Sequence, residues 1–202
     1  MWRLACVVCC AFQVRALSNG AIYLERGAST FDRFIEPFLF NARYNHVGLI
    51  LDREIVAQIN PSSLVPHQDW YVFSSLQRSE GITITSYVEE RQDPLVVSAF
   101  VRELPPHAFD RDKWVRVLQG MVGHHYDWLA VLTMHTNRSR STTGILWPLR
   151  RNRFTCASSV AHVLSEVGCA RFPNWQNTIP PDFDTQSTFG TIGCDYGTTT
   201  RI

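Results

Sequence analysis

A cysteine at the start of a predicted helix is the residue best placed to do chemistry. Cys156 opens the segment CASSVAHVLSEV, residues 156–167, whose apolar spacing is helical and which Gly168 ends. Unpaired backbone N–H groups and the positive end of the helix dipole favour a thiolate at such a position. Small residues follow it, so a substrate could approach, and the amide of Cys156 could help to bind an oxyanion. The sequence therefore predicts a nucleophilic thiol, with an inert buried cysteine as the alternative.

Two polar residues interrupt apolar segments that otherwise resemble core strands. His46 leads the segment 46–51, and Gln58 lies within the segment 55–59. The two segments predict a β-hairpin, and if residue 50 pairs with residue 54 then His46 and Gln58 share a face. Gln58 would then fix the tautomer of His46, which would act as the base for Cys156. The alternatives are a histidine satisfied within the core and a glutamine that bonds to solvent.

The remaining cysteines belong to two groups. Cys6, Cys9 and Cys10 lie in an apolar N-terminal run, where no second pair with metal-ligand spacing accompanies them. In an oxidising compartment we expect Cys169 and Cys194 to form a disulfide and to leave Cys156 as a thiol. In a reducing compartment both would be ordinary buried thiols.

The first sixteen residues differ in composition from the rest of the chain. Arg3 precedes an apolar run, residues 4–12, and residues 14–16 resemble a cleavage site, so 1–16 is predicted to be a signal peptide. A buried first helix is the alternative. With a signal peptide the protein would be secreted or in the lumen of the secretory pathway, and otherwise it would be cytoplasmic. Residues 17–202 are expected to form a single domain, because this length supports one core.

The elements that must position Cys156 and His46 predict an α+β fold. Apolar runs predict strands at residues 21–24, 46–51, 55–59, 81–88 and 95–102. Helical spacing predicts a broken helix at 30–41 and helices at 109–122 and 156–167. A polar stretch, residues 135–153, is predicted to be a long exposed loop ahead of Cys156. We expect an antiparallel sheet of four or more strands packed against helices.

Charge and composition argue against several classes of partner. The formal net charge is +1 and no long run of like charge occurs, so we expect no binding of nucleic acid. No apolar stretch is long enough for a stable membrane span. His124 and His125 are adjacent without further ligand spacing, so we expect neither a metal nor another cofactor. The sequence makes no prediction about the oligomeric state.

Four short motifs occur in an order that is typical of one enzyme family. They are N-H-V-G-L-I from residue 45, V-A-Q-I-N-P from residue 56, Gly123-x-x-Tyr126-Asp127-Trp128, and F-T-C-A-S-S-V-A-x-V-L from residue 154. The chain resembles the circularly permuted branch of the NlpC-type papain-like cysteine hydrolases, which has bacterial, poxviral and lecithin retinol acyltransferase-like members. In that branch the histidine precedes the cysteine. Residues 19–24 resemble its opening strand and residues 179–183 its closing segment, so the likeness extends from Ser18 to Thr185.

The resemblance implies a permuted papain-like fold in which Cys156 is the nucleophile, His46 the base and Gln58 the orienting residue. We expect cleavage of a peptide or other amide through an acyl-enzyme. Hydrolysis or transfer of an acyl-lipid ester is one alternative, and an inactive descendant that binds a ligand is another.

The chain departs from its relatives at Gln58, where they mostly carry glutamate or histidine. A neutral amide can orient an imidazole, but it cannot stabilise the imidazolium as a carboxylate does. Reduced activity, or a different third residue such as His67, is the alternative that this departure leaves open.

Overall fold

The computed structural model describes residues 17–30, 33, 43–76, 81–131, 152–172, 174–185 and 191–202. The predicted signal peptide lies outside these residues, as do most of the predicted broken helix and most of the predicted polar loop.

The main sheet has eight strands in the order β10-β5-β1-β2-β3-β4-β6-β7. Its strands are β1 (Ile22–Gly27), β2 (His46–Asp52), β3 (Trp70–Leu76), β4 (Gly81–Ser86), β5 (Val96–Arg102), β6 (His125–Tyr126), β7 (Arg153–Phe154) and β10 (Thr200–Arg201). Every neighbouring pair is antiparallel except β6 and β7, which run parallel. A separate antiparallel pair joins β8 (Ala170–Arg171) to β9 (Thr191–Ile192). The fold is thus α+β, with a mostly antiparallel sheet, as predicted.

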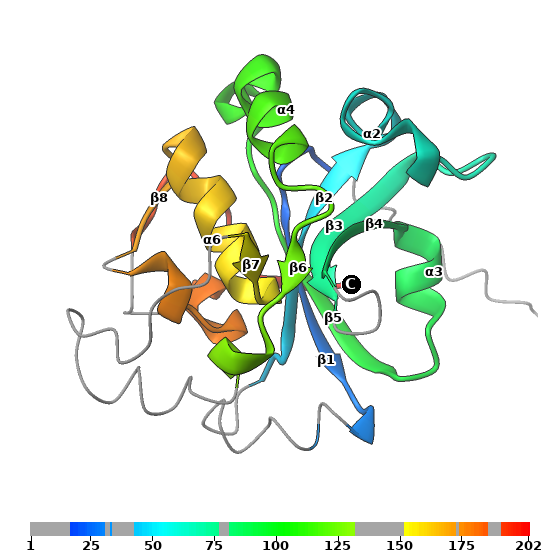
Figure 1. Cartoon of the computed structure of the whole chain (residues 1–202), viewed down its shortest axis with the longest axis vertical. Helices are drawn as coiled ribbons and strands as arrows, with labels where there is room; N and C mark the ends of the chain where they lie inside the picture. The colour runs from blue at the N-terminus through cyan, green and yellow to red at the C-terminus, as the bar shows by residue number, and fades with distance from the viewer. Residues whose placement is uncertain are drawn as a thin grey trace, which may run out of the picture.

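Helices cover both sides of this sheet. The α-helices are α2 (Arg53–Ile59), α3 (Tyr87–Gln92), α4 (Arg111–Gln119) and α6 (Cys156–Val167), and short 3-10 turns span Pro61–Ser63, Pro106–Ala108, Trp175–Asn177 and Pro180–Phe183. The helices α2, α4 and α6 share the larger core, whereas α3 lies over a smaller core on the opposite side of the sheet (Figure 1). We call these two sides the α6 side and the α3 side.

The alternation of residues along β2 explains the two cores. Val47, Leu49 and Leu51 pack on the α6 side, while Ile50 packs on the α3 side. Both faces of β2 are therefore buried, which accounts for the continuous apolar run in the sequence. The strand pairs with β1 and β3, which makes it a central strand of the sheet.

The prediction of a strand at 55–59 is wrong, because these residues belong to helix α2. The carboxylate of Asp52 accepts a hydrogen bond of 2.8 Å from the amide of Ile55 and so caps the helix. Ile55, Val56 and, in part, Ile59 are buried along one helical face, whereas Ala57 and Gln58 are exposed. The capping aspartate and the helical burial pattern outweigh the β propensity of the branched residues.

The strand that pairs with β2 in place of the predicted one is β3, which the apolar pattern did not identify. The predicted strand at 81–88 also ends early, at Ser86, whose side chain caps α3 by accepting a hydrogen bond from the amide of Glu89. The predicted strand at 95–102 and the predicted helices at 109–122 and 156–167 are confirmed with small changes at their ends.

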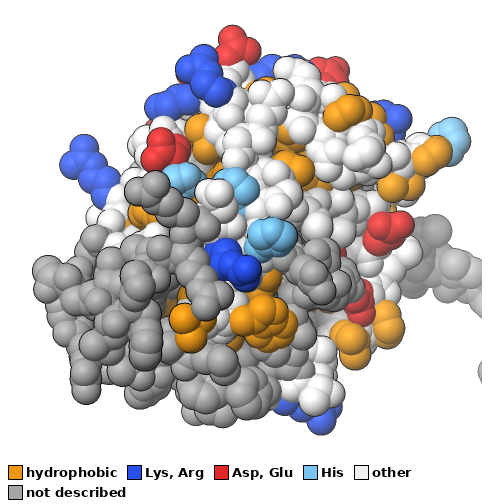
Figure 2. Space-filling model, in the orientation of Figure 1, with side chains coloured by type: hydrophobic (Ala, Val, Ile, Leu, Met, Phe, Trp, Pro, Cys, Tyr) orange, Lys and Arg blue, Asp and Glu red, His pale blue; other side chains and the backbone are white. Residues whose placement is uncertain are grey.

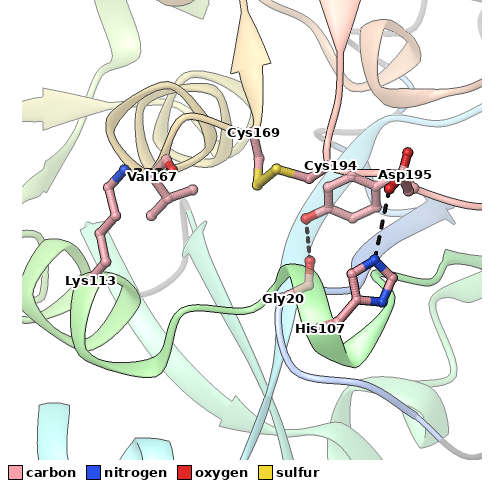
Figure 3. Close-up of a disulfide and its surroundings, with 8 residues drawn as sticks. Gly20, His107, Lys113, Val167, Cys169, Cys194 and Asp195 are labelled. Carbon is pink, nitrogen blue, oxygen red and sulfur yellow. Dashed lines mark hydrogen bonds and ion pairs between the residues drawn. A yellow bond between two sulfur atoms is a disulfide. The ribbon is translucent and has the colours of Figure 1, made fainter.

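A disulfide joins Cys169 to Cys194, as predicted for an oxidising compartment (Figure 3). Cys169 follows the left-handed Gly168 that ends α6, and Lys113 of α4 donates a hydrogen bond of 2.8 Å to the carbonyl of Val167. The C-terminal end of α6 is therefore held by a covalent link, a glycine cap and a cation.

Candidate active site

The helix α6 begins at Cys156 with a complete N-terminal cap. The hydroxyl of Thr155 accepts a hydrogen bond of 3.1 Å from the amide of Ser158, and the amide of Thr155 donates one of 2.8 Å to the Ser158 hydroxyl. The cap fixes Cys156 as the first residue of the helix, where the dipole favours a thiolate. Cys156 is 8% exposed and, among the described residues, is the only cysteine outside a disulfide.

The sheet brings Cys156 to the end of β2 that begins with His46. Leu49 pairs with Phe73, and continuing that antiparallel register places His46 opposite Leu76 at the end of β3. Leu76 pairs in turn with Gly81, beside which β6 and β7 lie. The hydroxyl of Ser75 donates a hydrogen bond of 2.8 Å to the carbonyl of Phe154, two residues before Cys156. Cys156 and His46 therefore lie at the same end of the sheet.

The two side chains leave the backbone on different sides of the sheet. Cys156 belongs to the core of the α6 side, together with Val47 and Leu49. The side chain of His46 points to the same side of β2 as those of alternate residues such as Ile50, which packs on the α3 side. The imidazole of His46 is half-buried, and its Nε2 atom is shielded from solvent. Only around the end of β2 could the imidazole and the thiol meet.

Gln58 does not share a face with His46, because the hairpin that would have joined them is absent. Gln58 lies on α2, beyond Asp52, and β2 extends about 20 Å from His46 to Asp52 at 3.3 Å per residue. Its side chain is exposed, and its Nε2 donates a hydrogen bond of 3.2 Å to the carbonyl of Glu54. The geometric argument for Gln58 as the orienting residue is therefore lost.

His67, the other residue considered for that role, is also far from His46. It is exposed and has a left-handed backbone, with a φ of 59°, shortly before β3. β3 begins with Trp70, which pairs with Asp52 at the far end of β2. His67 therefore lies at the opposite end of the sheet from Cys156.

The sequence reasoning missed Glu25, which lies directly opposite His46 in the pairing of β1 with β2. Glu25 is 8% exposed, and its carboxylate accepts a hydrogen bond of 2.9 Å from the hydroxyl of Tyr23. Burial raises the pKa of Tyr23 strongly, and the charge of Glu25 adds to this shift, so Tyr23 remains a donor. A charged residue within the apolar strand IYLERG was the available signal.

Aromatic rings and histidines pack beside Cys156, around Phe154. The ring of His124 stacks on Phe154 at 5.5 Å, and Trp175 stacks on it at 5.6 Å. The ring centroids of His162 and Trp175 are 4.7 Å apart. Burial lowers the pKa of His162, while the charge of Glu166 opposes that shift. Figure 2 shows histidine side chains close together near the middle of the face turned toward the viewer. These contacts hold the strand that leads into Cys156.

Within the described ranges, no group of three or more histidine, cysteine, aspartate or glutamate side chains could hold a metal ion. The same part of the chain contains no helix with the length and apolar character needed to cross a membrane.

No family model and no curated protein matches this sequence. Among solved structures, the metalloprotein yiiX of Escherichia coli O157:H7 (DUF1105) is similar, with a TM-score of 0.48 and 13% identity over 92% of this chain and 96% of that one.

Proposed function

We propose that this protein is a cysteine hydrolase that cleaves an amide or peptide bond, with Cys156 as the nucleophile and His46 as the base. The observation that carries the proposal is the sheet register, which leads from His46 through Leu76 and Gly81 to the capped start of α6. A thiol at a helix N-terminus and an imidazole at the same end of the sheet are the two groups that such a reaction needs.

The reaction would follow the chemistry of thiolate and imidazole. The thiolate of Cys156 attacks the carbonyl carbon, and backbone amides at the start of α6 bind the oxyanion. The imidazolium of His46 then gives its proton to the leaving amine, and an acyl-enzyme remains. Water, activated by His46, attacks this thioester, so the acid is released and the thiol is restored. For this sequence the imidazole must reach around the end of β2.

Alkylation by iodoacetamide, followed peptide by peptide with mass spectrometry, tests the thiolate. A model thiol with a pKa of about 8.5 reacts slowly at pH 6, whereas a thiolate paired with imidazolium reacts at that pH. We expect rapid labelling of Cys156 at pH 6 and slow labelling in His46→Ala. His67→Ala is the matched control, because His67 lies at the other end of the sheet, and it should label like the wild type. Labelling of Cys156 at the rate of a model thiol would refute the proposal.

Activity on panels of peptides, isopeptides and lipid esters, with Cys156→Ser as the blank, identifies the substrate class. Turnover of lipid esters alone would favour the acyl-lipid esterase or acyltransferase alternative.

A catalytically weak descendant that binds a ligand is the second candidate. The direction of the His46 side chain favours this second candidate, because the imidazole leaves β2 on the α3 side while Cys156 packs on the α6 side. Such a protein would show no turnover on any panel and no dependence of thiol reactivity on His46.

A further inference from the structure

We infer that Glu25, and not Gln58, is the residue that positions the imidazole of His46. This inference rests on the proposed function, since it names the third group of the same site. Glu25 would act through His46 and would not touch the substrate, so it is a positioning residue. The thiol lies on the α6 side of β2 and Glu25 on the α3 side, so an imidazole at the strand end would present one nitrogen to each.

The pairing of β1 with β2 places the two side chains together. Glu25 and His46 are direct partners in this antiparallel pair, so their side chains lie on the same side of the sheet with Cβ atoms about 5 Å apart. Asn45 fixes the register at this point. Its side chain accepts a hydrogen bond of 2.7 Å from the amide of Gly27 and donates one of 3.0 Å to the carbonyl of Gly27. A slip of one residue, which would separate the pair, is thereby prevented.

The carboxylate of Glu25 is itself held in place. The Tyr23 hydroxyl donates to its Oε2 atom at 2.9 Å, and the ring of Tyr23 packs edge-on against Tyr87 of α3, with centroids 6.1 Å apart. A carboxylate has a second oxygen, Oε1, that can accept from an imidazole N–H. The orienting group of a Cys–His pair must have a fixed position, and Tyr23 supplies it.

Charge distinguishes Glu25 from Gln58. A buried carboxylate beside an imidazole stabilises the imidazolium that forms during each transfer of a proton, which a neutral amide cannot do. The other charged groups that act on Tyr23 are Glu90 and Arg91, both on α3. On the flanking strands, Ala99 of β5 lies opposite Glu25 and Leu76 of β3 is next to His46, and neither side chain titrates.

An NMR titration of the His46 imidazole in the full chain tests the inference without relying on activity. We expect Glu25→Gln to lower the midpoint of the His46 titration by about one pH unit, because an opposite charge at this distance favours the imidazolium. Glu25→Asp, which retains the charge, should restore most of the shift. Gln58→Ala is the control and should leave the midpoint unchanged. An equal midpoint in wild type and Glu25→Gln overturns the inference, whatever the activity.

Kinetics give a second measurement. If the protein hydrolyses amides, Glu25→Gln should lower kcat by roughly 10²-fold with little change in KM, since Glu25 does not contact the substrate. A loss of the same size in Gln58→Ala would instead assign the role to Gln58 and overturn the inference.

If Cys156 proves unreactive while the titration still depends on Glu25, the proposed function fails and the Glu25–His46 pair stands. If Glu25→Gln does not fold, Glu25→Asp and the wild-type titration decide: a wild-type midpoint at or below about 6.5 overturns the pairing.

Discussion

The two sides of the main sheet bury apolar cores of different size. The α6 side carries a large apolar core that includes α2, α4 and α6, and its only described thiol is at the start of a helix. Among the described residues, the α3 side is covered by the short helix α3 and buries polar groups beside a small apolar cluster, while the α6 side also buries polar residues, such as Ser75 and Ser158. The polar groups of the α3 side are Tyr23, Glu25, Ser74 and Glu90, and the carboxylate of Glu90 accepts a hydrogen bond of 3.2 Å from the half-buried Thr85.

The difference indicates that the α6 side contributes mainly to stability and the α3 side to the proposed site. Apolar burial is the dominant favourable contribution to folding, so the α6 side supplies most of the stability. Buried polar groups cost free energy unless hydrogen bonds satisfy them. On the α6 side they satisfy the cap of α6 and the carbonyl of Phe154, whereas the buried carboxylate of Glu25 on the α3 side caps no described helix and needs another explanation. Under our proposal that explanation is the positioning of His46 by Glu25. Substitutions on the two sides test this comparison.

Phe73 and Val72 are neighbours on β3 that point to opposite sides, and both are fully buried. Phe73→Ala should lower the free energy of unfolding by about 4 kcal/mol, because it leaves a cavity in the large core. Val72→Ala should cost about 2 kcal/mol on the α3 side. Chemical denaturation measures both. A loss at Val72 equal to the loss at Phe73, although Val72→Ala removes fewer buried atoms, would contradict the larger contribution of the α6 side.

The disulfide strengthens the α6 side covalently. Cys169→Ser together with Cys194→Ser removes a link that spans 25 residues, and the loss of loop closure should cost about 3 kcal/mol. The measurement is denaturation with and without reductant. Reductant should then have no effect on the double variant. Reduction of the wild type without a change in its denaturation midpoint would contradict the prediction.

Sequence patterns predicted α6 and its disulfide far better than α2 or the pairing of Glu25 with His46. The bounds of α6 follow from the helical spacing after Cys156 and from the glycine at 168. The disulfide partners follow from the number and positions of the cysteines. The helix α2 was mistaken for a strand because its branched residues outweighed a capping aspartate that the pattern did not weigh. The role proposed for Glu25 depends on the pairing of β1 with β2. That pairing joins residues about 20 positions apart, and local periodicity cannot reveal it.

Ser74 and Ser75 offer a finer comparison, because they too point to opposite sides of β3. The Ser75 hydroxyl donates to the carbonyl of Phe154, whereas the buried Ser74 hydroxyl has no hydrogen-bond partner among the described residues. Ser75→Ala should therefore destabilise the protein by about 1 kcal/mol and loosen the approach to Cys156. Ser74→Ala should be neutral or should stabilise by up to about 1 kcal/mol, since it removes an unsatisfied group.

Denaturation gives both values, and alkylation of Cys156 reports whether the start of α6 has shifted. A destabilising Ser74→Ala would mean that this hydroxyl has a partner that supports the α3 side.

The smallest expected effect concerns pH and the α6 side. Burial lowers the pKa of His162 from its usual value near 6.5, with His124 adding to the shift and Glu166 opposing it. The native state therefore binds this proton less readily than the unfolded chain. The stability that this histidine contributes is fully present above about pH 6.5 and falls as the pH drops toward the lower native pKa.

We expect Tm to be lower at pH 5 than at pH 7, and His162→Phe to remove part of that loss. The exposed His125 supplies the control, because His125→Asn should retain the full pH dependence. An unchanged pH dependence in His162→Phe would mean that the rings around Phe154 do not disfavour the charged histidine, and the α6 side would then tolerate charge as the α3 side does.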